Sequence, residues 1–219
     1  MPLDFAVARE NMVENDVRTN DVTDRRLIAA MRAIAREEFV PAEHREIAYG
    51  DLSVPIGHGR YLLDPRTFSK LIQAAELKGS DSVLDIGCGM GYSALVLAQL
   101  AGRVIALEEE EALASAAARQ IARAGARNVV IERGFLKEGA RDHGPYDAIV
   151  IEGAVDEVPQ QLVDQLKPDG RLLCVQCRGG RLGRAIRFLK TADALSGRAL
   201  FDARVPMLPG FARPRAFVF

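Results

Sequence analysis

One segment of this chain constrains its fold more than any other. Residues 83–93 read VLDIGCGMGYS, an apolar run that ends at Asp85 and continues into a turn with glycine at every second position. A second apolar run ends at Glu108, 23 residues after Asp85. This spacing is typical of a βαβ unit, in which two parallel strands lie side by side and a nucleoside-bearing cofactor binds at their carboxyl ends.

The charge of Asp85 indicates which cofactor that is. A dinucleotide site has a glycine at the sixth position of its turn, whereas the sixth position counted from Gly87 is Tyr92. An acid directly before the turn would repel a pyrophosphate and attract the ammonium and sulfonium groups of S-adenosylmethionine. Glu108 has two carboxylate oxygens that can accept hydrogen bonds from ribose hydroxyls. We therefore predict a methyl-donor site, the alternative being an ordinary strand-to-helix turn.

Composition narrows the class of protein. The chain has 219 residues, 48% of them hydrophobic and 27% charged, which is typical of a globular protein with a sizeable core. Its net charge of −1 gives no general electrostatic footprint for nucleic acid. No apolar run approaches the length of a membrane span, and the first residues lack the pattern of a secretory signal. We expect a cytoplasmic monomer that binds neither nucleic acid nor membrane.

The cysteines do not predict a metal centre. Cys174 and Cys177 form a C-x-x-C pair, but they lie in an apolar run whose alternation places them on opposite faces of a strand, and no second ligand pair follows. We interpret them as strand residues and expect no metal.

The chain divides into a helical beginning and a regular remainder. Residues 1–65 are expected to form N-terminal helices and a substrate-side loop, packed on a cofactor-binding core of residues 66–219 within one structural domain. Helices are predicted over residues 5–17 and 23–35, the second with Thr23 as its N-cap and Asp21 as a competitor for that position. Residues 38–65 are rich in glycine, proline and isolated aromatics, which indicates an ordered loop with short strands.

Helical and strand patterns then alternate, which predicts an α/β fold with a doubly wound, mostly parallel sheet. The predicted helices are residues 67–75, 92–100, 111–124 and 158–165, and the predicted strands are residues 82–85, 104–108, 129–132, 148–152 and 171–175. Residues 182–190 fit a helix or a strand. Residues 199–201 and 216–219 are expected to add antiparallel strands at one edge.

Several motifs resemble one family, the protein-L-isoaspartate O-methyltransferases. They are NDVTDRRLIAAM at residues 20–31, EFVP at 38–41, AYGD at 48–51, VPIGHG at 54–59, the glycine motif, PYDAIV at 145–150 and QLKPDGRLL at 165–173. The similarity runs from about residue 11 to residue 173. It implies a class I methyltransferase fold with a Rossmann-like sheet of seven strands, and S-adenosylmethionine as cofactor.

The resemblance also implies a reaction, in which a methyl group passes to the carboxylate of an isoaspartyl residue in a protein or peptide. A carboxyl group with a pKa near 4 is already ionised at neutral pH, so positioning dominates catalysis. A small-molecule carboxylate would suit the same chemistry. The residues expected to contact the cofactor are Tyr61, Leu62, Asp85, Gly87, Cys88, Gly89, Tyr92, Glu108, Glu109, Gly134, Phe135 and Leu136.

The chain departs from this family after Gly59. There the family typically continues Gln-Thr-Ile-Ser, whereas this chain has Arg60, Tyr61, Leu62 and Leu63. Leu63 occupies the serine position and cannot form a hydrogen bond, and loss of one such donor costs about 10²–10³ in rate. We therefore expect weakened isoaspartyl repair. Phe135 and Leu136 replace the family's Asp-Gly, so a ring would pack on adenine in place of a hydrogen bond.

The substituted residues suggest their own roles. Arg60 either pairs with a substrate carboxylate or pairs with Asp64 and holds the loop. Asp64 could receive an amine or act as a base, and His58 is either a proton shuttle or a packing residue. Two alternatives to the isoaspartyl reaction follow: a methyltransferase for another acceptor, or a non-catalytic module that binds the cofactor.

Overall fold

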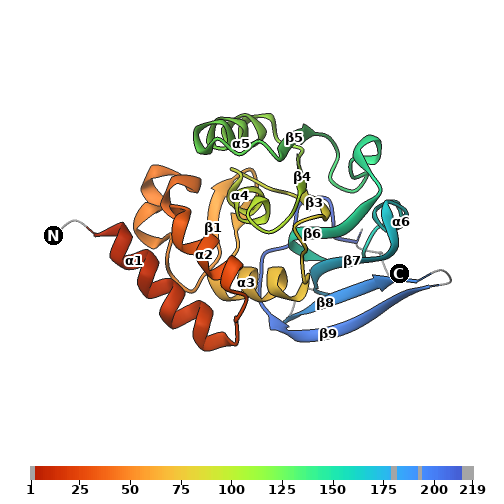
Figure 1. The fold of residues 1–219 in the computed structure, drawn as a ribbon, viewed down its shortest axis with the longest axis horizontal. Coiled ribbons are helices and arrows are strands. Elements are labelled where there is room, and N and C mark those ends of the chain that lie inside the picture. The colour runs from red at the N-terminus through yellow and green to blue at the C-terminus, as the bar shows by residue number, and fades with distance from the viewer. Residues whose placement is uncertain (1–2, 179–181, 192–193, 214–219) are drawn as a thin grey trace, which may run out of the picture.

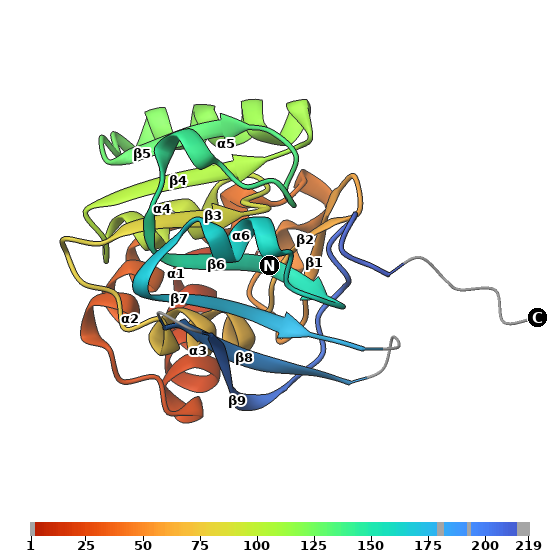
Figure 2. The ribbon, with the colours of Figure 1, turned by 90° about the vertical axis from the view of Figure 1, so that its right-hand side faces the viewer.

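A seven-stranded sheet forms the centre of the molecule. The computed structural model describes residues 3–178, 182–191 and 194–213. The strands are β1 (Val54–Gly57), β2 (Arg60–Leu62), β3 (Ser82–Ile86), β4 (Arg103–Glu108), β5 (Val129–Arg133), β6 (Tyr146–Val155), β7 (Leu166–Gln176), β8 (Gly183–Lys190) and β9 (Leu195–Ala203). Figure 2 shows the main sheet in the order β5-β4-β3-β6-β7-β8-β9, with the β1–β2 hairpin outside it. The five strands β3 to β7 are parallel, whereas β8 and β9 are antiparallel additions at one edge. The predicted fold class is confirmed.

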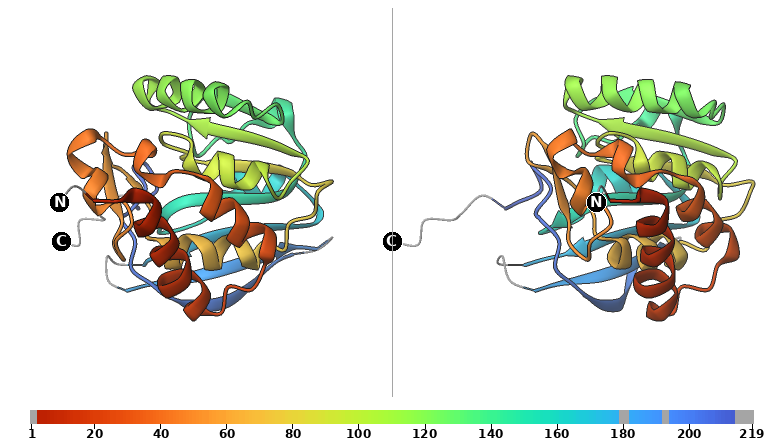
Figure 3. Two further views of the ribbon diagram at one scale, coloured as in Figure 1. Left: turned by 60° about the vertical axis from the view of Figure 1, so that its left-hand side comes forward. Right: turned by 90° about the vertical axis from the view of Figure 1, so that its left-hand side faces the viewer.

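Helices cover the sheet unevenly. They are α1 (Phe5–Met12), α2 (Arg25–Ala33), α3 (Pro65–Ala74), α4 (Tyr92–Ala98), α5 (Glu111–Ala124) and α6 (Gln160–Asp164). Short helical turns span Val13–Val17, Arg18–Asn20, Arg36–Phe39, Ala42–Ile47 and Arg141–His143. In Figure 1, α5 lies beside β5 at one end of the sheet, and the β8–β9 pair forms the other end. The N-terminal helices lie in front of the sheet in Figure 3.

The alternation of apolar residues along the strands makes two cores. Val83 and Val104 pack in one core with buried residues of α2, α3 and α4. Leu84 and Ile105, their neighbours in sequence, pack on the opposite face in a second core with Leu162 of α6. Since successive side chains of a strand point to opposite faces, both faces of the parallel sheet are buried. The second face is covered by one short helix, α6, and by irregular segments. The helical layer that a doubly wound sheet has on each face is therefore less regular here than on the first face.

Some local predictions are corrected. Asp24, and neither Thr23 nor Asp21, caps α2, because its carboxylate accepts the Arg26 N–H at 2.9 Å. Residues 182–190, which fitted either pattern, lie mainly in β8. The predicted strand 216–219 lies outside the described residues.

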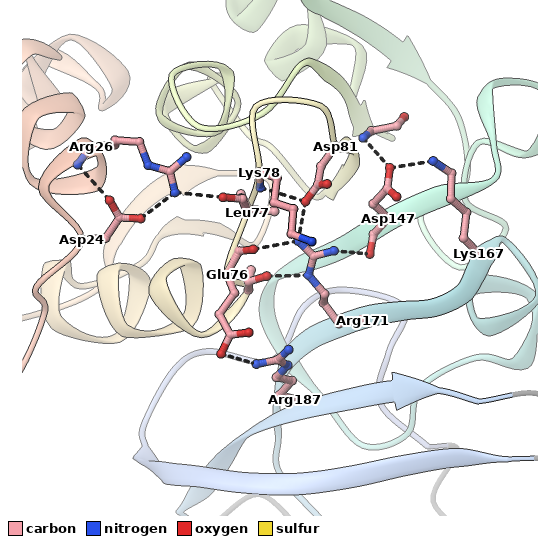
Figure 4. A network of polar contacts seen from close by, with 12 residues as sticks. Asp24, Arg26, Glu76, Leu77, Lys78, Asp81, Asp147, Lys167, Arg171 and Arg187 are labelled. Carbon is pink, nitrogen blue, oxygen red and sulfur yellow. Dashed lines mark hydrogen bonds and ion pairs between the residues drawn. The ribbon is translucent and has the colours of Figure 1, made fainter.

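A buried arginine joins the sheet to α3 at the amino ends of the parallel strands (Figure 4). Arg171 of β7 donates to the carbonyls of Ala75, Glu76 and Asp147 and forms an ion pair with Asp81. These contacts fix the carboxyl end of α3 against β6 and β7, and so fix the orientation of the helix on the sheet.

Cys174 lies on β7 and is fully buried, as the strand interpretation predicted, whereas Cys177, interpreted in the same way, lies just after the end of β7. Burial raises the pKa of its thiol to about 12, which keeps it protonated. Among the described residues, no helix combines the length and the apolar character that crossing a membrane requires.

Candidate cofactor and acceptor site

Three acidic side chains lie at the carboxyl ends of neighbouring parallel strands. Asp85 is on β3, Glu108 ends β4, and Glu152 is on β6, which pairs with β3 on its other side. Asp85 and Glu108 are fully buried, and Glu152 is 8% exposed. Isolated buried carboxylates are costly, so three of them at one edge of a sheet indicate a site for a ligand.

The turn after β3 is built from glycine for steric reasons. Gly87, Gly89 and Gly91 all have positive φ angles. A Cβ atom on Gly89 would lie 2.4 Å from Cδ1 of Ile56 and would have to displace the end of that side chain, and the φ of +55° strains any residue other than glycine. The turn leads directly into α4, whose first residue is Tyr92. Without side chains on these glycines, the backbone of the turn can make close contact with whatever packs on it, which in this structure is the Ile56 side chain of β1.

Asp85 is only partly satisfied by its surroundings. Its Oδ2 accepts the Ser93 hydroxyl at 2.6 Å, while Oδ1 is buried without a hydrogen-bond partner. Burial and, to a smaller extent, the nearby Glu108 raise the pKa of Asp85 to about 7. A cationic ligand beside Oδ1 would satisfy it and favour its ionised form.

Glu152 is the acid that the sequence interpretation missed. Its Oε1 is buried without a partner, and burial together with Asp85 raises its pKa well above the usual value for glutamate. The signal was present, because Glu152 follows the apolar residues 148–151 just as Asp85 and Glu108 follow theirs.

Glu108 makes the strongest contact of the site, and its partner is Arg60. Arg60 Nη2 and Nε lie 3.1 and 3.2 Å from Glu108 Oε1, in an ion pair whose side chains are 2% and 0% exposed. The amides of Gly89, Glu109 and Glu110 also donate to this carboxylate, at 3.0, 2.8 and 3.0 Å. The predicted pairing of Arg60 with Asp64 is wrong, because Arg60 extends from β2 to the end of β4.

Asp64 has a structural task. Its carboxylate accepts the Thr67 N–H at 2.8 Å and caps α3, which begins at Pro65. Next to it, the Leu63 side chain is 2% exposed and packs in the first core, and the Leu63 carbonyl accepts a hydrogen bond from the buried Arg36. Of residues 61–64, only Tyr61 and Leu62, both expected to contact the cofactor, line the cavity beside the glycine turn.

That cavity is very small. It measures about 10 Å³ and lies between the β1–β2 hairpin and the glycine turn. Its lining consists of Phe39, Ile56, Tyr61, Leu62, Gly87, Cys88, Gly89, Met90, Tyr92, Ser93 and Glu152. Six of the predicted site residues, Tyr61, Leu62, Gly87, Cys88, Gly89 and Tyr92, are thus brought together, around a space that holds about one water molecule.

His58 lies away from this cavity, at the turn of the hairpin. Its φ angle is +51°, its side chain is 47% exposed, and its Nδ1 lies 3.3 Å from Glu110 Oε2. The hairpin therefore contacts this part of the chain twice, through a buried ion pair with Glu108 of β4 and through an exposed contact with Glu110, the N-cap of α5.

A larger pocket lies on the other side of β4. It measures about 580 Å³, and Leu107, Gly134 and Phe135 are among its lining residues. The ring of Phe135 is 63% exposed, whereas Leu136 is buried in the second core. Phe135 is thus free to pack on a flat ligand in this pocket, and Leu136 supports the turn from below.

The C-terminal segment also reaches the site, which no sequence pattern indicated. The Leu208 N–H donates to the Ala154 carbonyl at 2.9 Å, and a Cβ atom on Gly87 would lie 3.1 Å from Cδ1 of Leu208. The segment closes the second face of the sheet beneath the glycine turn.

Comparison with known proteins identifies the family. The model of the family described as protein-L-isoaspartate(D-aspartate) O-methyltransferase matches residues 7–198. The chain belongs to this family. A protein-L-isoaspartate O-methyltransferase 1 from Rhodopseudomonas palustris is 39% identical over 206 residues, which are 93% of this chain and 84% of the relative. A Roseiflexus castenholzii protein-L-isoaspartate O-methyltransferase is 37% identical over 96% of both chains.

Solved structures support the same fold. A protein-L-isoaspartate O-methyltransferase superposes with a TM-score of 0.79 at 27% identity, over 92% of this chain and 66% of the other. A Plasmodium falciparum protein, solved with S-adenosyl-L-homocysteine, has a TM-score of 0.77 at 22% identity over 91% of this chain and 97% of its own. Family membership confirms the class I methyltransferase fold and the predicted cofactor, S-adenosylmethionine.

The residues of this chain fit that cofactor. The unpartnered Asp85 Oδ1 suits a cationic amino acid portion, the glycine turn admits a close ligand, and Phe135 stands in a pocket wide enough for a base. Glu108 has the right chemistry for ribose hydroxyls, although Arg60 holds it in this structure.

Proposed function

We propose that this protein transfers the methyl group of S-adenosylmethionine to the free α-carboxylate of isoaspartyl residues in damaged proteins or peptides, as a repair reaction. Family membership over residues 7–198 carries the proposal. The cleft beside the glycine turn supports it, because Glu152 lines the cleft and two further buried acids suited to a cationic methyl donor, Asp85 and Glu108, lie at the carboxyl ends of the neighbouring strands. Bound there, the cofactor supplies an activated methyl group.

The residues of the chain act by binding and positioning. Asp85 holds the cationic amino acid portion, Glu108 and the Glu109 backbone hold the ribose, and Gly134, Phe135 and Leu136 enclose the base. Gly87, Cys88 and Gly89 bring the backbone close to the ligand, while Tyr61, Leu62 and Tyr92 exclude water above it. The acceptor carboxylate needs no general base because it is already ionised.

Glu152 is the residue of this site that faces an acceptor. Burial raises its pKa, which favours the neutral form, and a neutral carboxyl group donates a hydrogen bond to a carboxylate in place of repelling it. Leu63, at the position of the family's serine, offers no hydroxyl donor, and among residues 60–63 the only hydroxyl is that of Tyr61.

Methyl transfer to a synthetic isoaspartyl peptide tests the proposal. With labelled S-adenosylmethionine, the isoaspartyl peptide is methylated and the same peptide with ordinary aspartate is not. If neither peptide is labelled but another acceptor in a lysate is, the proposal is wrong, and the protein is a methyltransferase for that other acceptor.

Leu63→Ser tests the weakened activity. We expect it to raise the rate on the isoaspartyl peptide by about 10²–10³, the effect of one well-placed donor. Leu71→Ser, an equally buried leucine of α3, controls for the loss of packing and should give no gain. A wild-type rate that Leu63→Ser does not raise would show that Leu63 does not limit the reaction.

A further inference from the structure

The cleft beside the glycine turn is closed by the chain itself. Ligand sites for molecules of nucleoside size measure about 300–1,000 Å³, whereas the cavity between the β1–β2 hairpin and the turn measures about 10 Å³. Three of the side chains that line this cavity, Ile56, Tyr61 and Leu62, belong to the hairpin, and Cδ1 of Ile56 lies over Gly89. The cavity must therefore widen on the side of the hairpin before a cofactor can lie on the turn.

The ribose-binding carboxylate is also fully occupied. A carboxylate has about four acceptor sites, and Glu108 receives the amides of Gly89, Glu109 and Glu110 together with two N–H groups of Arg60. The three amides belong to the turn and to the start of α5, so they stay in place when the hairpin moves. Arg60 is the only one of these donors that the hairpin carries.

We propose that Arg60 is a latch that holds the β1–β2 hairpin closed over the glycine turn by occupying Glu108, so that the cofactor binds only after this ion pair separates. Arg60 is thereby a residue that sets the affinity for the methyl donor. This inference rests on the proposed use of S-adenosylmethionine.

The hairpin has the structure of a movable element. Its two strands form a separate two-stranded sheet outside the main one. Gly57 and Gly59, both with positive φ, flank His58 at its turn. Its second contact near this site, between His58 and Glu110 at the start of α5, is exposed on both sides and contributes little.

The latch is also incompletely bonded. Arg60 Nη1 is buried without a hydrogen-bond partner. An unsatisfied charged donor costs free energy in the closed form, which makes separation of the pair accessible to a ligand that satisfies Glu108 and Asp85 instead.

Titration with S-adenosyl-L-homocysteine tests the latch. If only the open form binds, the apparent Kd is the intrinsic Kd divided by the open fraction. We expect Arg60→Gln to lower the Kd by tenfold or more, with the gain in the association rate. The control is Arg184→Gln, which removes an exposed ion pair between Arg184 of β8 and Asp202 of β9 and should leave the Kd unchanged.

Hydrogen exchange gives a readout that does not depend on activity. In the free protein, the amides of β1 and β2 should exchange faster in Arg60→Gln than in the wild type, while β3 and β4 remain protected. In case Arg60→Gln does not fold, the Nε–H signal of Arg60 in the wild type serves the same purpose. It should be protected in the free protein and lose protection when S-adenosyl-L-homocysteine saturates the site.

Each opposite result is decisive. Weaker binding by Arg60→Gln would show that Arg60 is a ligand of the cofactor, and equal binding would show that the ion pair is no barrier, so either overturns the latch but keeps the proposed cofactor. If neither protein binds S-adenosyl-L-homocysteine, the proposed cofactor use fails and the latch fails with it.

Discussion

The carboxyl group of Asp85 is the side chain of this site whose charge state should control ligand binding. Its pKa is raised to about 7, mainly by burial. The ammonium group of the ligand stabilises the ionised form, so binding expels a proton below pH 7, and affinity falls as the pH falls. We expect the Kd for S-adenosyl-L-homocysteine to be about tenfold higher at pH 6 than at pH 8, by the one-proton relation. Calorimetry across this range measures it.

Asp85→Asn is the control for that prediction. It removes the charge and keeps the size of the side chain, so its binding should be weaker and independent of pH between 6 and 8. A pH dependence that persists in Asp85→Asn would assign the proton to another group, such as Glu152.

At this scale, strand ends were predictable and long-range partners were not. Asp85 and Glu108 stood out because each follows an apolar run that can only be a buried strand. The partner of Arg60 could not be predicted, since Glu108 lies 48 residues away and no local pattern records how a hairpin packs on another strand. Asp24 was overlooked as a cap because Asp21 and Thr23 nearby have equally suitable side chains.

Among the elements, α3 depends on the cap that the sequence interpretation considered as a base. Asp64→Ala removes the acceptor of the Thr67 amide, so we expect the free energy of unfolding to fall by about 0.5–2 kcal/mol. Asp64→Asn keeps an acceptor and should lose less. Denaturant unfolding measures both losses. Asparagine can cap the helix but cannot act as a base, so, if Asp64 serves only as a cap, methyl transfer per folded molecule should remain unchanged in Asp64→Asn. A large loss of rate in this variant would restore Asp64 as a base.

Among the elements, those with a clear local sequence pattern were predictable and those without one were not. The helix predicted over residues 111–124 has those bounds in the structure, because its apolar spacing and its closing Gly125 agree. The segment that brings Leu208 to the glycine turn has neither helical nor strand periodicity. Its position depends on the shape of the second core, and that shape cannot be predicted until the arrangement of the strands in the sheet is known.

The whole molecule has its functional edge and its structural edge at opposite ends of the parallel strands. At the carboxyl ends, acidic groups remain unsatisfied and await a ligand. At the amino ends, Arg171 contacts three carbonyls and Asp81, and ties together α3, β6 and β7. Unsatisfied groups cost stability, so a firmly bonded opposite edge allows the site to keep them.

This division predicts how the molecule responds to loss of the arginine. Arg171→Met keeps the length of the side chain but leaves Asp81 and the three carbonyls without their donor, and breaking one partner of a buried pair costs about 3–5 kcal/mol. We expect a fall of that size in the free energy of unfolding, measured with denaturant. Arg187→Met, at the more exposed pair with Glu76, should cost about 1 kcal/mol or less.

The affinity of Arg171→Met for S-adenosyl-L-homocysteine should change little, because Arg171 fixes the end of α3 that is remote from the site. We expect it to stay within about twofold at temperatures where the variant is folded, as for distant sites that do not couple. A small loss of stability with a large loss of affinity would mean that the two edges are coupled through α3.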